Sequence, residues 1–167
     1  KSWLTAVNTA GANNKLTVGG TVRVVIIDST FGVPSSTLVG QVQTAVDPTQ
    51  NSGEGYGLAP IGHVVKVEGV GSEAISLSFT LTFQSGWTWN DVETYVEAAI
   101  SGYFSELAKT WADSGEPLVV RVSQIESRIL GVAGVLDITG TKINGKAANH
   151  TLAADKIPVL GTITEGG

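Results

Sequence analysis

Two long periodic segments stand out in the pattern of apolar and polar residues, and both lie in the second half of the chain. From Ile75 to Phe83 large apolar residues alternate with Ser and Thr, which predicts a strand with one buried face and one wet face. From Asp91 to Trp111 apolar residues, Tyr95 among them, recur at helical spacing, which predicts a long amphipathic helix with these residues on its buried face. We place its N-cap at Asn90, with Glu93 completing a capping box, and its end before Gly115.

Shorter elements complete the second half. The pattern predicts a strand at Leu118 to Val122, a short helix opened by Ser123 with Glu126 and closed at Gly131, a strand from Val135 to Ile143 that ends at the Asn144-Gly145 turn, and, after an irregular crossing, a last strand from Val159 to Thr164. Pro158 at the start of the last strand suits either an edge strand or the entry of a strand. The long helix is expected to pack across one face of this sheet.

The first half has a simpler pattern. Thr21 to Asp28 is a continuous β-branched run, which predicts a central strand buried on both faces. Ser35 or Ser36 is expected to cap a helix that stops near Asp47-Pro48, and His63 to Val70 restarts strand alternation. The predicted loops are Lys1 to Gly20, read as loop or edge ribbon, and the glycine-rich stretch from Thr49 to Gly62. In the second loop, Gly57 and Gly62 are expected to adopt backbone angles that other residues resist.

Together these elements predict an α+β protein made of two small α/β subdomains, each a mixed sheet with a helix packed on one face. The first, residues 1–70, is strand, helix and strand. The second, residues 71–167, is a strand, a long helix and further strands. The boundary is expected between Gly69 and Ser72.

Composition and charge restrict the function. Of 167 residues, 42% are hydrophobic and only 15% charged, so part of the surface is expected to face a partner. A net charge of -5 without a basic cluster argues against binding nucleic acid or a membrane surface. The apolar runs are far shorter than the roughly 20 residues of a membrane helix. The chain has no cysteine, and because it begins at Lys1 and lacks methionine we interpret it as a fragment of a longer protein without a visible signal peptide.

Residues that could carry chemistry are scattered. The only histidines are His63 and His150, and the carboxylates Asp28, Asp47, Glu54 and Glu68 occur singly, so no metal-site spacing exists. A triad of His63, Asp28 and a serine lacks the Gly-x-Ser-x-Gly turn of a hydrolase. The glycines at 53, 55 and 57 follow a helix and precede a strand, the reverse of a phosphate-binding loop. We therefore predict no catalytic, cofactor-binding or metal-binding residue, no cofactor, and no enzyme activity.

The four tryptophans leave an alternative function open. Trp111 falls on the apolar face of the long helix and is expected in the core, while either Trp87 or Trp89 is expected to pack on the first turn and the other to remain exposed. With Trp3, an exposed tryptophan would suit a carbohydrate- or protein-binding module of a secreted or surface protein. Asn149-His150-Thr151 matches a glycosylation acceptor, but no secretory context accompanies it.

Several short phrases occur in a fixed order along nearly the whole chain. They are TVRVVIID from Thr21, GYGLAPIGHVVKV from Gly55, ELAKTW from Glu106, VVRVSQIESRI from Val119, GVAGVLDIT from Gly131, ING from Ile143 and IPVLGTIT from Ile157. In this order they resemble the middle and C-terminal domains of the baseplate J-like family. The first twenty residues match least well.

The resemblance implies a structural, non-enzymatic subunit of the baseplate of a contractile phage or prophage tail. Such a subunit belongs to the wedges that form a ring around the tail hub, so its expected partners are other wedge subunits and copies of itself in a sixfold ring. Its expected location is the virion tail baseplate, assembled in the cytoplasm of the bacterial host, and a monomeric isolated fragment is compatible with this. We further hypothesise that the junction from Val70 to Glu73 acts as a hinge when the tail contracts.

Overall fold

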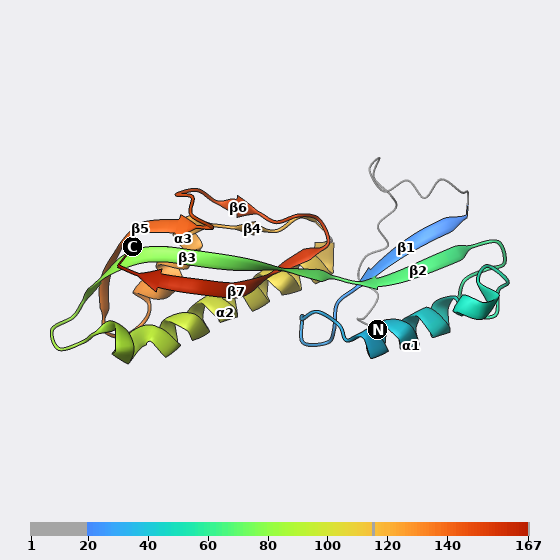
Figure 1. Cartoon of the computed structure of the whole chain (residues 1–167), viewed down its shortest axis with the longest axis horizontal. Coiled ribbons are helices and arrows are strands. Elements are labelled where there is room, and N and C mark those ends of the chain that lie inside the picture. The colour runs from blue at the N-terminus through green and yellow to red at the C-terminus, as the bar shows by residue number, and fades with distance from the viewer. Residues whose placement is uncertain (1–19, 115, 167) are drawn as a thin grey trace. The chain divides into compact units, whose positions relative to one another are not determined.

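The computed structural model describes residues 20–114 and 116–166. Their elements in chain order are β1 (Thr21–Ile26), α1 (Ser36–Val46), the 3₁₀ turn η1 (Thr49–Asn51), β2 (Val64–Gly69), β3 (Gly71–Phe83), α2 (Trp89–Ser114), β4 (Val119–Val120), α3 (Val122–Leu130), β5 (Val135–Ile143), β6 (His150–Thr151) and β7 (Lys156–Glu165) (Figure 1). They form two compact units: the first ends at Gly71 and takes in residues 112–114, and the second holds the remaining described residues. Trp3 and most of the predicted N-terminal loop or ribbon lie outside the described residues.

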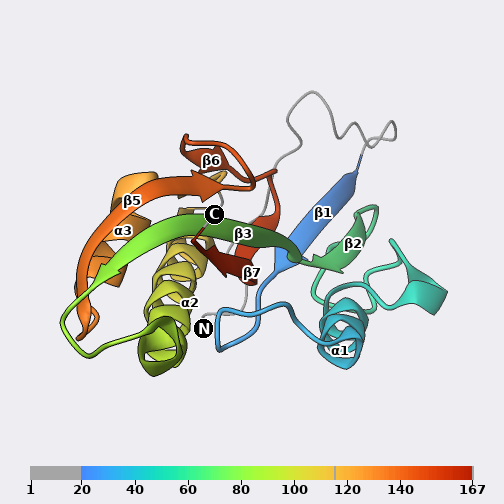
Figure 2. The ribbon, with the colours of Figure 1, turned by 60° about the vertical axis from the view of Figure 1, so that its left-hand side comes forward.

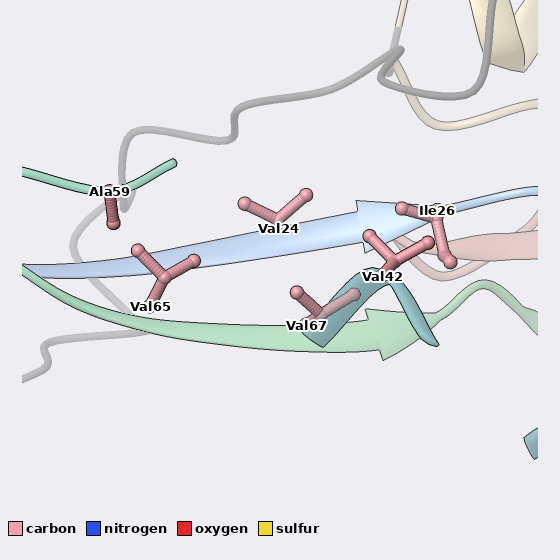
Figure 3. Packing of buried hydrophobic residues seen from close by; sticks show 6 residues of the cluster. All are labelled: Val24, Ile26, Val42, Ala59, Val65 and Val67. Carbon is pink, nitrogen blue, oxygen red and sulfur yellow. The ribbon is translucent and has the colours of Figure 1, made fainter. Parts of the chain in front are cut away.

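The first unit is built as strand, helix and strand, as predicted. β1 and β2 run parallel, with Thr21 beside Val64 and Ile26 beside Gly69, and α1 packs against β2. Side chains from all three elements and from the loop before β2 meet in one core (Figure 3): Val24, Ile26, Val42, Ala59, Val65 and Val67. This core fixes α1 across one face of the strand pair.

The predicted central position of the first strand is wrong for the part of the chain that the structure describes, where β1 pairs with β2 alone. Both Val24 and Val25 are nevertheless buried, although successive side chains of a strand point to opposite faces. A continuous β-branched run therefore reports burial of both faces and not the number of neighbouring strands.

The second unit contains a three-stranded sheet in the order β5-β3-β7. β5 runs antiparallel to β3, with Leu81 opposite Ile138. β7 runs parallel to β3, because Gly161 lies against Ile75 and Ser76 while the N–H of Gly166 donates to the carbonyl of Phe79 further along. β7 is an edge strand of this sheet, which is one of the two positions that Pro158 suits. Because β7 begins at Lys156, Pro158 is its third residue and does not stand at the strand entry. A short antiparallel pair, β4 with β6, lies within the crossing that the pattern left irregular.

The long helix α2 supplies most of the second core, and Figures 1 and 2 show it running along one face of the sheet. Its buried residues include Val92, Val96, Ile100, Phe104, Ala108 and Trp111, and those of β3 are Ile75, Leu77, Phe79 and Leu81. The rings of Trp89 and Phe79 meet edge to face with centroids 6.2 Å apart. α3 packs against β5. The predicted α+β class and the two long periodic elements are confirmed.

The start of α2 differs from the prediction. The helix begins at Trp89, so Asn90 is inside it and is not its cap. Asp91 instead accepts hydrogen bonds at Oδ2 from the Thr88 N–H, at 2.8 Å, and from the Thr88 hydroxyl, at 2.6 Å. These bonds give both donors of Thr88, the residue before the helix, a partner. The carboxylate of Asp91 also places a negative charge in the first turn of α2, where the helix dipole favours it.

The cap of α3 was also predicted wrongly. Arg121 occupies the N-cap position without a side-chain cap bond, and Ser123 is the second helical residue. The exposed N–H of Val122 is satisfied by Asn149 Oδ1, at 3.0 Å, from the segment before β6. A local pattern cannot reveal a partner so distant in sequence. The predicted cap at Ser35, which accepts from the Leu38 N–H at 3.2 Å, and the end of α3 at Gly131 are confirmed.

Candidate interaction surfaces

The candidate residues for chemistry, beginning with His63 and Asp28, take part in hydrogen bonds that stabilise the fold. His63 is exposed in the loop before β2, and its backbone N–H donates to the carbonyl of Pro60. Asp28 Oδ1 accepts from the N–H and hydroxyl of Thr30 and from the N–H of Gly32. Burial opposes ionisation of Asp28, but the bonds from Gly32 and Thr30 outweigh it, so the pKa of this carboxyl lies below its ordinary value. Within residues 20–114 and 116–166, no group of three His, Asp or Glu could hold a metal ion.

Asp47 is a structural anchor that sequence reasoning missed. It is 2% exposed and accepts hydrogen bonds from the Ser52 hydroxyl at 2.6 Å, the Gly53 N–H at 2.9 Å and the Val65 N–H at 2.8 Å. The bond from Ser52, followed by those from Val65 and Gly53, lowers the pKa of Asp47. One carboxylate therefore ties the end of α1 to the loop and to β2.

The other two candidate carboxylates, Glu68 and Glu54, also have partners within the first unit. Glu68 pairs with Lys66 and with Arg23 on the adjacent strand, and hydrogen bonds from Lys66 and then Arg23 lower its pKa. Glu54 accepts from Asn51.

His150, for which the sequence suggested no partner, places Nε2 2.5 Å from Glu73 Oε1 and so joins β6 to β3. The two residues are half-buried and far apart in the chain, so no local signal could have found the pair.

A first candidate surface lies on the loop between η1 and β2, within the phrase GYGLAPIGH. Tyr56, Leu58 and Ile61 are 74%, 74% and 77% exposed, and Val64 at the start of β2 is 44% exposed. We call these four residues the loop surface. Large apolar side chains so close in sequence and so exposed add nothing to the core, which is typical of a contact surface.

The backbone of this loop is fixed although its side chains are exposed. The N–H groups of Leu58 and Ala59 donate to Ala45 and Val46 at the end of α1, and the N–H of Gly62 donates to the carbonyl of Gly53 at 2.8 Å. We expected Gly57 and Gly62 to adopt backbone angles that other residues resist. Gly62 does so, with φ of +84°.

Gly57 is needed for a different reason. A Cβ on this residue would lie 2.4 Å from the carbonyl oxygen of Val46, so only glycine allows the loop to rest against the end of α1. The loop surface is therefore held in place before any partner binds.

A second candidate surface is a groove in the second unit, where α2 begins and α3 ends. It has a volume of about 640 Å³ and is lined by Trp87, Asp91, Tyr95, Gly131, Val132 and Ala133. Trp87 is 39% exposed, so the predicted exposure of one of the two tryptophans is confirmed. The predicted packing of the other on the first turn of the helix is wrong, because Trp89 is itself the first residue of α2 and packs on Phe79 of β3. Tyr95, which the periodicity assigned to the buried face of α2, is 65% exposed instead. We call this site the Trp87 groove.

A smaller hollow of about 380 Å³ lies in the first unit. It is lined by Ile27, Asp28, Ser29, Leu38, Gln41, Val42 and Ala45. Its one charged lining residue is Asp28, whose Oδ1 is already bonded within its own turn.

In the described part of the chain, no helix has the length and apolar character needed to cross a membrane.

Comparison with known proteins gives consistent matches. The family model of the baseplate J-like central domain matches residues 2–69, and that of the baseplate J-like protein C-terminal domain matches residues 75–165. Two Bacillus subtilis (strain 168) proteins are similar over 144 residues: the uncharacterized protein YqbT, 31% identical, and the phage-like element PBSX protein XkdT, 29% identical. Each match covers 86% of this chain and 39% of the relative, so the chain spans well under half of their length.

Among solved structures, a chain in the cryo-EM structure of the anti-feeding prophage baseplate, sixfold symmetrised, is similar in fold. The TM-score is 0.58 at 8% sequence identity, and the match covers 87% of this chain and 30% of that chain. At so low an identity the likeness concerns the fold alone.

Proposed function

This chain belongs to the baseplate J-like family, and from that membership we propose that it is a structural part of the contractile-tail baseplate of a phage or prophage. The observation that carries the proposal is the pair of consecutive family matches, which together span almost the whole chain. The name of the relative XkdT, a phage-like element protein, supports it. The family supports a role in assembly without catalysis.

The finer assignment follows the two halves of the chain. Residues 1–70 would be the middle domain and residues 71–167 the C-terminal domain of a wedge subunit. The two family matches leave a break between residues 69 and 75, close to the point where β2 gives way to β3. Its partners would be other wedge subunits and copies of itself in a sixfold ring, in the virion tail baseplate and assembled in the host cytoplasm.

The loop surface gives this role a physical basis. Burying exposed apolar side chains stabilises a contact by about 25 cal/mol per Å² removed from water. A loop whose backbone is already fixed loses little conformational entropy on binding, so more of the free energy gained by burying apolar area contributes to affinity. In a closed ring each subunit makes several contacts at once, and individually weak contacts then suffice. The loop surface is therefore proposed as a contact with a neighbouring subunit.

Purified tail particles test the proposal. The source organism is induced, the particles are isolated, and quantitative mass spectrometry gives the ratio of the parent protein to the tube subunit. A small fixed multiple of six copies per particle is expected. Absence of the protein from intact particles, with the protein found free or at the cell surface, would overturn the proposal and favour the alternative of a carbohydrate- or protein-binding module.

The same assay tests the loop surface. The double variant Leu58→Asp with Ile61→Asp is expected to keep the melting temperature of the chain but to abolish incorporation into particles. Val33→Asp is the matched control, because Val33 is also an exposed apolar residue of the first unit but lies outside the loop surface. Normal incorporation of the double variant would exclude the loop surface as a contact while leaving the copy-number result intact.

A further inference from the structure

The Trp87 groove combines aromatic, acidic and apolar groups in a way that the loop surface does not. We propose that it receives the guanidinium side chain of an arginine presented by a neighbouring protein. The proposal rests on the proposed function in one respect, that the partner is another protein of the assembly.

The aromatic wall of the groove is rigid. A Cβ on Gly134 would lie 2.3 Å from Cε3 of Trp87, so the indole rests directly on the backbone of Gly134. The turn before α2 holds it there, because the N–H of Trp87 donates to the carbonyl of Gln84 and the N–H of Gln84 donates to the carbonyl of Gly134. A partly exposed indole fixed in this way offers a preformed face for a cation, and Tyr95 adds a second aromatic ring to the lining.

The acidic wall is supplied by Asp91. Both of its hydrogen bonds, from the hydroxyl and then the N–H of Thr88, use Oδ2 and lower the pKa of the carboxyl, so it is charged at neutral pH. None of the residues that line the groove carries a positive charge. The nearest basic residue along α3, Arg128, is paired with Glu106. The carbonyl end of α3 at Leu130 adds partial negative charge beside the groove.

Arginine fits this combination better than other side chains. Its planar guanidinium can stack on an indole and donate to a carboxylate at the same time, whereas a lysine ammonium is a compact charge that cannot stack. A purely apolar side chain would cover Asp91 and leave its carboxylate desolvated and unpaired, which is costly. The volume of about 640 Å³ leaves room for the residues that flank the arginine.

The test uses the whole 167-residue chain and three capped tripeptides. Acetyl-Gly-Arg-Gly-amide is titrated while NMR follows the tryptophan indole N–H signals, with Trp87 assigned by its loss in Trp87→Leu. The arginine peptide is expected to shift this signal and the amide signals of Gly131 to Ala133 with a Kd on the order of 1 mM. The citrulline peptide, a neutral isostere, is expected to bind at least about tenfold more weakly because it has no charge to pair with Asp91.

Two variants separate the charge from the fold. Asp91→Asn keeps an oxygen that can accept from Thr88 and is expected to weaken arginine binding about fivefold to tenfold. Asp113→Asn removes the same charge near the opposite end of α2 and is expected to change binding less than twofold. The third tripeptide carries leucine in place of arginine. The proposal would be overturned if the leucine peptide bound as tightly as the arginine peptide, if the arginine peptide did not shift the Trp87 signal, or if both variants lost the same amount of binding. None of these outcomes alters the particle copy number that tests the baseplate role.

Discussion

At the scale of single residues, Asp47 does most to shape the first unit. A buried carboxylate is costly unless it is hydrogen-bonded, and Asp47 meets that requirement through three donors from the loop and β2. Because two of these donors, Ser52 and Gly53, begin the loop, the same bonds fix the start of the segment that carries the loop surface. The rigidity of a proposed contact thus depends on a residue that contributes nothing to its exposed face.

Asp47→Asn is expected to reduce stability in a pH-dependent way. The folded pKa of Asp47 lies below its ordinary value of 3.8, so its contribution is fully present above that value and is lost as the pH falls below it. In the variant the amide NH₂ cannot accept from these donors. Urea unfolding from about pH 7 down to about pH 2 should therefore show a deficit that shrinks as the wild-type carboxyl is protonated.

Glu54→Gln provides the control for this series, because Glu54 is an exposed carboxylate of the same loop. Its substitution is expected to change the free energy of unfolding by less than about 0.5 kcal/mol at neutral pH. A deficit for Asp47→Asn that stays constant across the whole pH range would show that the charge of Asp47 does not stabilise the fold.

At the scale of elements, helix α1 closes one edge of β2. The N–H of Val64 points toward β1 and donates to the carbonyl of Gly20, so the N–H groups of Val65 and Val67 point away from β1. They donate to Asp47 and to Gln43 Oε1, while Gln43 Nε2 donates to the carbonyl of Val65 at 2.9 Å. Side chains of a helix thus take the place of a third strand and protect this edge from pairing with other chains.

Gln43→Ala is expected to lower the free energy of unfolding by about 1–3 kcal/mol, because it leaves backbone groups of β2 without partners. Native-state hydrogen exchange should show faster exchange of the Val67 amide. Gln41→Ala, at an exposed position of the same helix, is the control and should cost less than about 0.5 kcal/mol. Unchanged protection of Val67 in Gln43→Ala would contradict this role of the side chain.

The same elements show which features a sequence can reveal. The alternation in β3 and the helical spacing in α2 were predicted correctly because each element buries one face. Burial of one face produces a periodic pattern of apolar residues within the element itself. The cap of α3 by Asn149 and the edge bonds of Gln43 were not predicted, because each joins segments far apart in the chain. Tyr95 was misplaced because helical spacing alone does not show where the apolar face of α2 meets its neighbours and where it borders the Trp87 groove.

At the scale of the whole molecule, the phrases behind the family resemblance coincide with the two candidate surfaces. GYGLAPIGH holds three residues of the loop surface and the Gly57 contact with α1, while GVAGVLDIT holds three residues of the groove lining and the Gly134 contact with Trp87. Sequence alone could therefore name the family and yet not identify these surfaces, since exposure and groove shape depend on the folded backbone. The hinge near Val70 to Glu73 stays a prediction, although Val70 is the one residue between β2 and β3.

The division into two units leads to a prediction about folding. The buried residues of α2 and β3 lie in the second unit, apart from those at the end of α2, and the first unit has a separate core built on α1, β1 and β2. A fragment of residues 72–167 is therefore expected to fold alone. It should melt in one cooperative transition followed by circular dichroism and give dispersed amide signals by NMR, with the complete chain as the reference.

The end of α2 is the part of this fragment that is expected to differ from the complete chain. Residues 112–114 at the end of α2 associate with the first unit, so in the fragment that last turn should fray while the helix from Trp89 to Trp111 persists. Its Trp87 indole signal should then match that of the complete chain, because the residues lining the groove all belong to the second unit. A fragment that binds hydrophobic dyes and lacks dispersed signals would show instead that the second core needs the first unit to reach its native packing.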